Sequence, residues 1–380
     1  MNHREASAAN VLGARVGVLG GGQLGRMLGL AGRALGLELV FLDPSPDSPA
    51  RAVGELIVSS YEGAAALARF ADTRVVTFEF ENVPVAAVQA LEGSGQVFPG
   101  SRALEVAQDR WHEKTCFRSL GIATPAFEAV GTWPELAAAL KRVGLPAVLK
   151  TRRFGYDGKG QAVLRTEADA HAAFQRLSGA PLILEGFVPF ERELSIIAVR
   201  SSEGEVACYP LVQNHHQGGI LQKTLAPAPA VSAELQRVAR QHIEKLLSHL
   251  EYVGVLALEL FQRGDSLLAN EIAPRVHNTG HWTIEGARTS QFENHLRAIL
   301  GLPLGATDAI APCAMLNLIG AAPDARAVLA VPDAHLHWYG KEPRPGRKVG
   351  HVTVLAPDAA TLAERVSQLE RILASGSGTP

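Results

Sequence analysis

Two glutamates, Glu259 and Glu271, stand in otherwise apolar segments, VLALELF and SLLANEIA, that read as neighbouring β-strands. A carboxylate in such a strand is costly unless a cation or strong donors meet it. The Gly264-Asp265 turn predicts a hairpin that brings Glu259 roughly level with Asn270 and Glu271. Two carboxylates and an amide oxygen suit magnesium, which usually completes its shell with substrate phosphates. The sequence therefore predicts a magnesium site here, with an exposed, salt-bridged hairpin face as the alternative.

A glycine-rich turn, Gly20 to Gly25, follows an apolar strand and opens a helix, and Asp43 ends the next strand. This spacing satisfies the G-x-G-x-x-G pattern of dinucleotide-binding folds. The physical basis is broader, because glycines let the backbone approach a ligand and helix N-terminal amides favour any anion. Three interpretations stay open: a dinucleotide, another phosphorylated ligand, or a tight turn without a ligand.

A second glycine-rich segment, Gly155 to Gly160, lies between a strand that ends at Lys150 and one that starts at Gln161. Its glycines and basic side chains predict a mobile flap that folds over phosphates, with an exposed hairpin loop as the alternative. Lys150 either points its charge at a phosphate or snorkels at the strand end.

Acidic residues mark two further strand ends. Glu185 ends one strand and Glu193 begins the next, so both carboxylates could accept ribose hydroxyls. The backbone of Gly186 to Val188 could pair with an adenine edge. The alternative is that both glutamates are solvated surface acids.

Polar clusters interrupt the apolar pattern at three more places. Asn214 to Gly219 holds adjacent histidines without zinc spacing, which favours a polar loop near a ligand. Arg275, His277 and Asn278 follow the second glutamate strand and would place donors beside the metal, or form a hydrogen-bonded loop. Basic residues between Lys341 and Lys348 make a rigid loop suited to one phosphate group, or a solvated charge run.

The composition excludes several classes of partner. Charged residues make up 19% of the 380 residues and the formal net charge is −2, which gives no general basic surface for nucleic acid or membrane. Three scattered cysteines fit a reducing compartment. The start of the chain lacks a signal-peptide core, and no segment stays apolar for about 18 residues. We therefore expect a cytoplasmic protein that binds neither nucleic acid nor membrane.

The elements that must position these residues combine α/β and α+β organisation. From Arg15 to about Val97, short β-branched runs alternate with helical stretches, which is typical of a parallel sheet with crossover helices. A small second unit and a mainly antiparallel third portion follow. One helix is expected over Ala103 to Leu120, and Ser290 with Glu293 predicts the start of another.

A set of motifs connects these fragments. They are GGGQLGRM at Gly20 to Met27, FEFENV at Phe78 to Val83, QDR at Gln108 to Arg110, GYDGKGQ at Gly155 to Gln161, NHHQGGIL at Asn214 to Leu221, NEIAPRVHNTGHWT at Asn270 to Thr283 and RPGRKVGH at Arg344 to His351. In this order they resemble ATP-grasp carboxylate-amine ligases, and as a set they resemble the 5-(carboxyamino)imidazole ribonucleotide synthase family of de novo purine synthesis. The resemblance spans about Arg15 to Leu369.

The resemblance implies an ATP-grasp fold, with a Rossmann-like parallel-sheet domain, a small central lid domain and a mainly antiparallel C-terminal domain. The expected divisions are a disordered N-terminus at 1–14, the Rossmann-like domain on the substrate side at 15–110, the lid domain at 111–186, the C-terminal ATP-grasp domain with a small terminal β subdomain at 187–372, and a flexible tail at 373–380.

The activity that the resemblance implies is ATP- and bicarbonate-dependent carboxylation of the amine of 5-aminoimidazole ribonucleotide. ATP would phosphorylate bicarbonate to carboxyphosphate, and the amine would capture the activated carboxyl group while ADP and phosphate are released. Magnesium, with manganese as a substitute, would accompany ATP, and the enzyme would be a homodimer.

The resemblance also implies residue roles by motif position. Glu259 and Glu271 would hold the metal, while Arg275, His277 and Asn278 would act as catalytic residues on bicarbonate or carboxyphosphate. The ATP-binding residues would be Arg110, Lys150, Gly155, Tyr156, Asp157, Gly158, Lys159, Gly160, Gln161, Glu185, Gly186, Phe187, Val188, Glu193, His216, Asn270 and Glu271. The ribonucleotide-binding residues would be Gln23, Leu24, Glu79, Asn82, Tyr156, Arg347 and Lys348.

Other functions stay open on the sequence alone. An NAD-dependent oxidoreductase follows from the turn at Gly20 to Gly25, but it leaves Glu259 and Glu271 unexplained. A formate- or amino-acid-using ATP-grasp ligase and a non-catalytic nucleotide sensor are the further alternatives.

Overall fold

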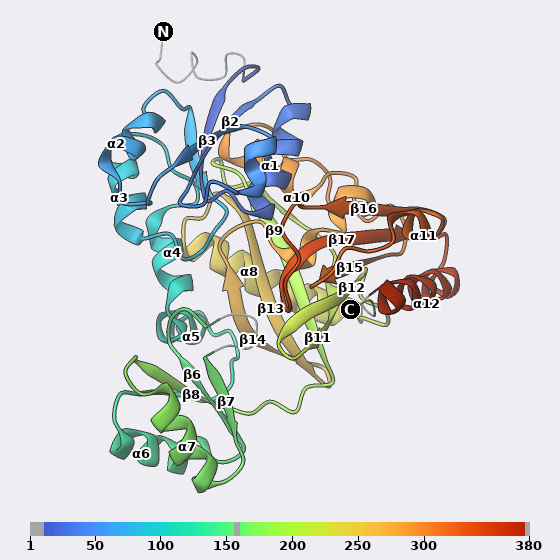
Figure 1. Ribbon diagram of the computed structural model, residues 1–380. Coiled ribbons are helices and arrows are strands. Elements are labelled where there is room, and N and C mark those ends of the chain that lie inside the picture. The colour runs from blue at the N-terminus through green and yellow to red at the C-terminus, as the bar shows by residue number, and fades with distance from the viewer. Residues whose placement is uncertain (1–10, 156–159, 377–380) are drawn as a thin grey trace.

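The computed structural model of the chain describes residues 11–155 and 160–376. These residues form three β-sheets with helices packed around them (Figure 1). The N-terminal sheet is parallel and the other two are antiparallel, which confirms the predicted combination of α/β and α+β organisation. Within the described ranges, no helix is long and apolar enough to cross a bilayer.

The parallel sheet has the strand order β3-β2-β1-β4. Strands β1, β2 and β4 are largely buried on both faces, so they read as continuous apolar runs, whereas edge strand β3 is more exposed. The strands are β1 (Arg15–Leu19), β2 (Glu38–Asp43), β3 (Glu55–Val58) and β4 (Val75–Phe78), and the helices nearby are α1 (Gln23–Ala34), α2 (Ala64–Leu67), α3 (Val85–Glu92) and α4 (Ser101–Gln108).

A small antiparallel sheet follows, in the order β5-β8-β6-β7, and is reached through helix α5 (Arg110–Ser119) (Figure 1). Two helices cover it and share its own apolar core. These elements are β5 (Phe127–Val130), α6 (Trp133–Val143), β6 (Ala147–Thr151), β7 (Gln161–Leu164), α7 (Glu167–Leu177) and β8 (Leu182–Gly186).

The largest sheet has nine strands, in the order β14-β13-β9-β11-β12-β15-β17-β16 with β10 paired to β9. Its strands are β9 (Arg192–Arg200), β10 (Val206–Cys208), β11 (Val212–Gln217), β12 (Ile220–Ala226), β13 (Gly254–Arg263), β14 (Ser266–Ala273), β15 (Cys313–Ile319), β16 (Ala334–Trp338) and β17 (Lys348–Leu355). Its helices are α8 (Ala233–His249), α9 (Thr283–Gly286), α10 (Gln291–Ile299), α11 (Ala325–Leu329) and α12 (Ala359–Gly376).

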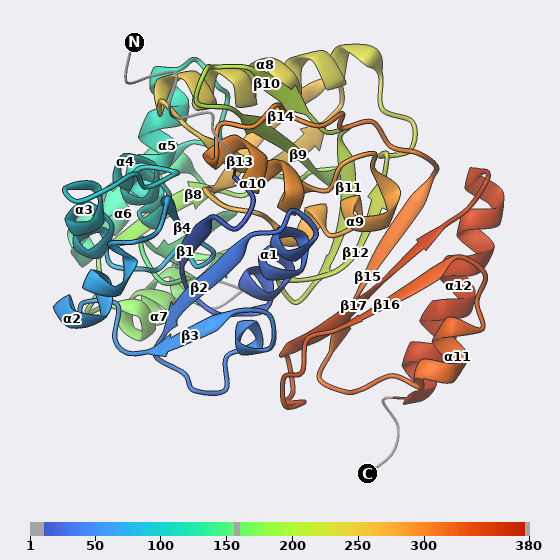
Figure 2. The same cartoon turned by 90° about the horizontal axis from the view of Figure 1, so that it is seen from above.

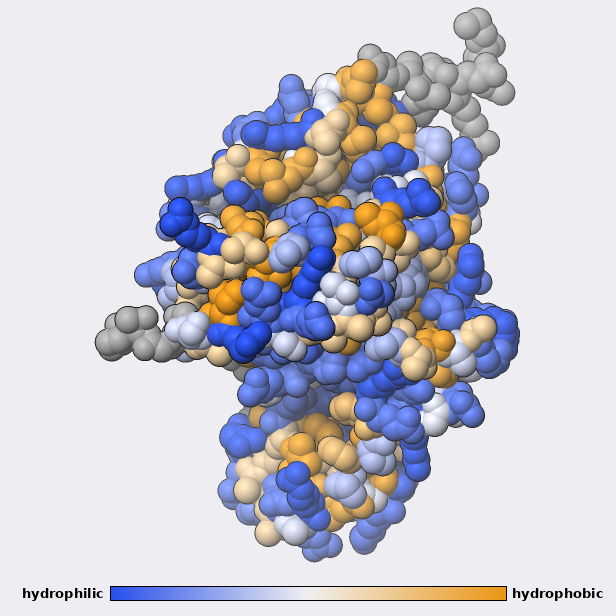
Figure 3. All heavy atoms as spheres, turned by 90° about the vertical axis from the view of Figure 1, so that its right-hand side faces the viewer, coloured by the Kyte–Doolittle hydropathy of each residue, from blue (hydrophilic) through white to orange (hydrophobic). Residues whose placement is uncertain are grey.

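Helices pack on both faces of this sheet. Ile243 and Leu246 of α8 lie in a core cluster with Leu256 and Leu258 of β13, while the other face of β13 packs against α10. Helices α11 and α12 lie beside β15, β16 and β17 at the end remote from α8 (Figure 2). On the face that forms the right-hand side of Figure 1, hydrophobic and hydrophilic residues are interspersed (Figure 3).

The parallel sheet is anchored on the large sheet through α1 and α10, whose apolar residues share one core cluster. A buried polar contact adds to it, since Thr77 Oγ1 of β4 lies 2.8 Å from His295 Nε2 of α10. The glycine turn at the start of α1 therefore has a fixed position relative to the large sheet.

Two predicted elements differ in the structure. The helix expected over Ala103 to Leu120 is broken at Asp109, which has extended backbone angles and caps α5 by accepting from the Trp111 amide. The segment Asn214 to Gly219 was predicted to be a polar loop, but it forms most of β11 and its turn into β12. Its alternating side chains can therefore serve two faces of the sheet.

The chain ends also differ from the predictions. Residues 1–10 and 377–380 lie outside the described residues, but Val11 and Ala14 pack against the main core cluster instead of being disordered. Helix α12 continues to Gly376, so the expected flexible tail begins as helix. Apolar burial and continued helical hydrogen bonding account for both differences.

We expect Gly350→Ala to destabilise the fold. Gly350 lies in β17, which pairs with β15 on one side and β16 on the other. A Cβ added to Gly350 would lie 2.5 Å from the backbone oxygen of His337 in β16. Because a backbone atom cannot move aside cheaply, the free energy of unfolding should fall by about 1–3 kcal/mol. The matched control is Gly95→Ala, since no atom lies within 4 Å of a Cβ there. Equal denaturant midpoints for the two variants would contradict the packing argument.

Candidate active site

The hairpin of β13 and β14 brings the two glutamates together as predicted. Glu259 is the strand partner of Glu271, whereas Leu260 is opposite Ala269, so Asn270 is an extra residue in a β-bulge. Ala269 and Ile272, on either side of the bulge residues, both lie in the core cluster under α8. The bulge therefore turns Asn270 and Glu271 together toward the opposite face, which carries Glu259.

The electrostatics of this pair favour binding of a cation. The Glu259 side chain is 15% exposed and the Glu271 side chain 45%. Burial, followed by the neighbouring charge of Glu271, raises the pKa of Glu259 to about 8. Two carboxylates and the bulge amide fit a magnesium ion that also binds phosphate oxygens. Among the described residues, no group of three or more His, Cys, Asp or Glu side chains could hold a metal by itself.

A buried cationic cluster lies next to this pair. Lys150 Nζ of β6 lies 3.0 Å from Glu185 Oε2 of β8, and Lys114 Nζ of α5 lies 3.5 Å from the same oxygen. Burial alone would raise the pKa of Glu185, but the two ammonium groups lower it to about 2. Its Oε1 atom is buried without a hydrogen-bond partner among the described residues, which leaves an acceptor open.

Arg110 ties the base of the glycine flap to the metal side of the site. Its guanidinium donates to the Thr151 carbonyl at 3.2 Å and the Gly155 carbonyl at 2.6 Å, and lies 3.9 Å from Glu271 Oε2. Gly160 and Gln161 lead from the flap into β7. The flap residues predicted to bind ATP between them, Tyr156, Asp157, Gly158 and Lys159, lie outside the described residues.

Of the adjacent histidines, His216 faces the carboxylate pair. Its Nδ1 lies 2.8 Å from Glu193 Oε2. Burial lowers the pKa of His216, but the Glu193 hydrogen bond and the charge of Glu259 raise it above the ordinary value overall. His215 instead lies 3.2 Å from Gln213 Nε2, and a bulge separates the two rings. The two side chains therefore have different surroundings, and only the His216 ring contacts the predicted site residue Glu193.

The segment Gly186 to Val188, at the end of β8, has fewer available backbone amides than we predicted. The Gly186 amide donates to the Ala126 carbonyl at 2.8 Å, and the Phe187 amide donates to the Pro146 carbonyl at 3.1 Å. Both amides are already used within the protein. Any backbone donor to an adenine edge in this segment therefore has to come from Val188.

Backbone amides of the glycine turn before α1 donate to carboxylates of the protein itself. Glu79 accepts from the Gly22 amide at 2.8 Å and the Gly25 amide at 3.2 Å, while Asp43 accepts from the Gly21 amide at 2.8 Å. In a dinucleotide-binding fold these amides would face the pyrophosphate. The turn therefore argues against the NAD interpretation, and it explains why Glu79 is buried beside glycines.

The predicted ribonucleotide residues come from segments far apart in sequence. Lys341 Nζ donates to Gln23 Oε1 at 3.0 Å, which joins the basic loop to the start of α1. Arg347 donates to the Glu342 carbonyl at 3.1 Å, and Lys348 begins β17. Two of the predicted residues are buried. Leu24 is packed in the main core, so only its backbone can reach a ligand, and both carboxylate oxygens of Glu79 accept from the glycine turn. Asn82, after β4, is half-buried.

The three predicted catalytic residues lie between the carboxylate pair and the parallel sheet. Arg275 donates to Glu81 Oε2 at 2.6 Å, and His277 Nε2 lies 3.5 Å from Glu259 Oε1. Burial, with the charge of Arg275 second, lowers the pKa of His277 well below its ordinary value, so the ring is neutral. Asn278 has two buried amide atoms without a hydrogen-bond partner in the described ranges, which leaves both for a ligand or water.

Sequence reasoning missed several residues that shape the site. Gln291 holds the backbone of His277 from both sides, accepting from its amide at 2.9 Å and donating to its carbonyl at 2.6 Å. Glu81 pairs with Arg275, and Glu113 and Lys114 of α5 contact the bulge. Glu81 lies within the quoted FEFENV motif, whereas the other three sit in ordinary helical patterns that give no functional signal.

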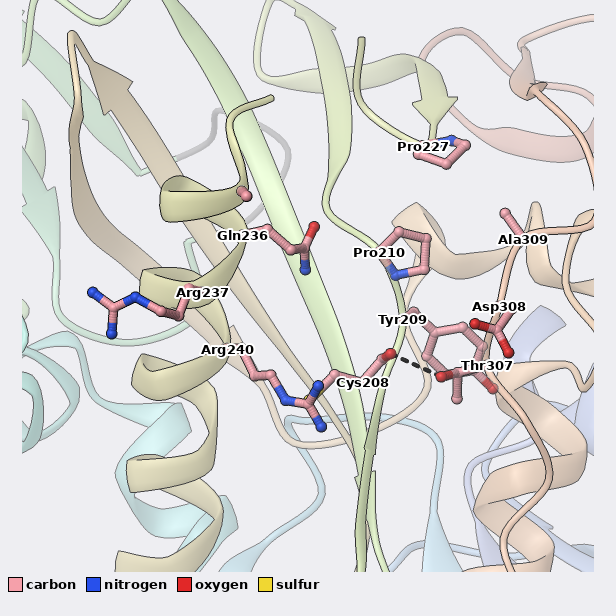
Figure 4. A pocket seen from close by; sticks show the side chains of 11 residues that line it. Cys208, Tyr209, Pro210, Pro227, Gln236, Arg237, Arg240, Thr307, Asp308 and Ala309 are labelled. Atoms are coloured by element: carbon pink, nitrogen blue, oxygen red, sulfur yellow. Dashed lines mark hydrogen bonds between the residues drawn. The ribbon is translucent and has the colours of Figure 1, made fainter. Parts of the chain in front are cut away.

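A separate cavity of about 520 Å³ opens between α8 and the 307–309 segment (Figure 4). Its arginines, Arg237 and Arg240, are paired with Glu234 and Glu244 on the same helix. The residues that line it include none of the predicted site residues. The candidate active site is therefore the group of residues around Glu259, not this cavity.

Comparisons with known proteins agree with the geometry. Family models match a ribonucleotide synthetase preATP-grasp domain at residues 14–108, an ATP-grasp domain at 115–292 and a phosphoribosylaminoimidazole carboxylase C-terminal domain at 313–365. The N5-carboxyaminoimidazole ribonucleotide synthase of Pseudomonas aeruginosa is 52% identical over 360 residues, covering 94% of this chain and 99% of that protein. That of Bacillus subtilis is 40% identical, covering 90% and 92%.

Solved structures give the same result. The N5-carboxyaminoimidazole ribonucleotide synthetase of Thermus thermophilus has 57% identity and a TM-score of 0.91, covering 94% of this chain and 98% of that one. The Aspergillus clavatus enzyme, solved with ADP and 5-aminoimidazole ribonucleotide, has 34% identity and a TM-score of 0.89, covering 96% and 99%. The chain thus belongs to the N5-carboxyaminoimidazole ribonucleotide synthase family of ATP-grasp ligases.

Proposed function

We propose that the chain uses ATP and bicarbonate to carboxylate the exocyclic amine of 5-aminoimidazole ribonucleotide, releasing ADP and phosphate, in purine biosynthesis. The observation that carries the proposal is the position of segment 275–278. It contacts Glu259 of the carboxylate pair through His277 and Glu81 of the parallel-sheet domain through Arg275. A nucleotide on one side and a ribonucleotide on the other would therefore meet at this segment.

The chemistry requires activation because bicarbonate is a poor electrophile. A bicarbonate oxygen attacks the γ-phosphorus of ATP, the bond to the β-phosphate oxygen breaks, and ADP leaves with carboxyphosphate formed. The amine lone pair then attacks the carboxyl carbon, the bond from that carbon to the phosphate oxygen breaks, and phosphate leaves. The nitrogen loses one proton. The protein contributes positioning and stabilisation of developing charge, at about 1.5–3 kcal/mol for each charged hydrogen bond.

On this proposal the residues divide by what they contact. Glu259 and Glu271 would hold Mg²⁺, or Mn²⁺, which when bound would neutralise phosphate charge. Lys150 and Arg110 would contact phosphates. His277 Nδ1 accepts from the Thr279 amide at 3.4 Å and lies 2.9 Å from Thr279 Oγ1. In the tautomer in which Nδ1 is the acceptor, Nε2 carries the hydrogen and would donate it to a bicarbonate oxygen.

The nucleotide and ribonucleotide contacts complete the assignment. We propose that His216, Glu193, Glu185 and Val188 bind the rest of ATP. The open Glu185 acceptor and the Glu193-held His216 ring support these contacts. Residues near Gln23 and Lys348 would bind the ribonucleotide and its phosphate. The division at 15–110, 111–186 and 187–372, a homodimer and a cytoplasmic location are part of the same proposal. The family resemblance supports them, and three free cysteines, which fit a reducing compartment, support the location.

The function is tested by phosphate release from magnesium-ATP. We expect release to rise strongly when both 5-aminoimidazole ribonucleotide and bicarbonate are added, and to stay near background when either is left out, because neither acceptor alone completes the reaction. Release that formate or an amino acid stimulates instead would point to another ATP-grasp ligase. A protein that binds ATP but shows no stimulation would be a nucleotide sensor, and the proposal would fail.

We expect Glu271→Gln to reduce turnover by about a hundredfold or more, because a neutral amide binds Mg²⁺ far less well than a carboxylate. The substitution should not lower the unfolding midpoint, since it removes repulsion with Glu259. Turnover and thermal unfolding of the same sample measure both effects. Glu234→Gln is the matched control, because Glu234 forms only an exposed pair with Arg237. Full activity of Glu271→Gln would remove its assigned role.

A further inference from the structure

Two buried residues of helix α5, Glu113 and Lys114, form hydrogen bonds with the β14 bulge. Lys114 Nζ donates to the Asn270 carbonyl at 2.6 Å and lies 3.4 Å from the Ala269 carbonyl. Glu113 Oε1 accepts from the Ile272 amide at 2.6 Å. A bulge interrupts the strand ladder, and these two side chains supply partners to backbone groups on both sides of the interruption.

The cost of burying these charges argues that they do more than stabilise the fold. Glu113 is 2% exposed and Lys114 is 1% exposed. Lys114 forms a buried salt bridge with Glu185, and such a bridge is weak evidence for stability, because well-packed apolar residues often do as well or better. Its better-attested use is to specify one structure among alternatives. Here the alternative is a strand without the bulge.

The position of the bulge matters because side chains alternate along a strand. A slip of one residue would turn a side chain from one face of the sheet to the other. Without the bulge, either Glu271 or Ile272 would have to point away from its observed side. Glu271 would leave the face of Glu259, or Ile272 would leave the core under α8.

We propose that Glu113 and Lys114 are positioning residues that hold the β14 bulge in register and so aim Asn270 and Glu271 at the nucleotide. Lys114 also lies 3.5 Å from Glu185 Oε2 of β8, so one ammonium group contacts both the bulge and the small sheet. It thereby sets the distance between the metal carboxylates and the Lys150–Glu185 pair. The role rests on the proposed function for its catalytic consequence, but nucleotide binding tests it separately.

The hydrogen bond between Glu113 and the Ile272 amide makes a matched pair of variants available. The amide N–H needs an oxygen acceptor at this position, and a side-chain amide supplies one as a carboxyl group does. Glu113→Gln keeps that acceptor, whereas Glu113→Leu has a similar size and removes it.

The test is the affinity for ADP in saturating and limiting Mg²⁺, measured by calorimetry together with thermal unfolding. We expect Glu113→Gln to bind as the unaltered protein does. Glu113→Leu should bind magnesium-ADP at least about tenfold more weakly and need more Mg²⁺ for half-maximal binding, as the loss of one strong hydrogen bond predicts. If Glu113→Leu does not fold, Lys114→Met, which keeps the apolar stem and removes the donor to Asn270, carries the same expectation.

A control separates positioning from general stability. Ile243→Ala on α8 opens a cavity in the core cluster under the same strands, but it leaves the hydrogen bonds of Glu113 and Lys114 to the bulge in place. It should lower the unfolding midpoint but leave the affinity of the folded protein for magnesium-ADP unchanged. Unchanged affinity for magnesium-ADP in the Glu113→Leu or Lys114→Met variant would overturn the positioning role. So would an equal loss of that affinity in the Ile243→Ala and Glu113→Gln variants. Absence of ribonucleotide-stimulated turnover in the unaltered protein would instead overturn only the proposed function.

Discussion

The structure depends on the opposition of Glu259 and Glu271 across the β13–β14 hairpin. Two carboxylates this close on a mostly buried face repel each other, and the pKa of Glu259 is raised to about 8 as a result of burial and that repulsion. The neutral His277 beside Glu259 does not relieve the repulsion. A magnesium-bound nucleotide would offset this repulsion, which supports the proposal that the pair holds the metal.

The rest of the molecule places complementary groups around this pair. The small sheet contributes Lys150 and Glu185, which form an ion pair, and the hairpin of β11 and β12 contributes His216. Glu81, which follows strand β4 of the parallel sheet, accepts a hydrogen bond from Arg275 on the segment after β14. The glycine turn of this sheet is closed by internal carboxylates, which separates it from dinucleotide-binding folds that look alike in sequence.

The sequence predicted the fold class and the level pairing of Glu259 with Glu271, because apolar periodicity and a Gly-Asp turn are local signals. It did not predict the bulge, which depends on α5 residues far away in the chain. It placed His216 in a loop, whereas the residue lies in β11, next to a bulge that separates it from His215. Gln291, Glu113 and Lys114 were missed because their roles exist only after distant segments pack together.

The central claim is that this site phosphorylates bicarbonate beside the ribonucleotide amine. The most direct measurement follows oxygen from ¹⁸O-labelled bicarbonate during a single turnover, with 5-aminoimidazole ribonucleotide present and the released phosphate observed by ³¹P NMR. Attack of a bicarbonate oxygen on the γ-phosphorus leaves that oxygen in the phosphate after the carboxyl group is transferred. We predict label from bicarbonate in the phosphate. Phosphate that carries only solvent oxygen would contradict the account, because water rather than bicarbonate would then be the nucleophile.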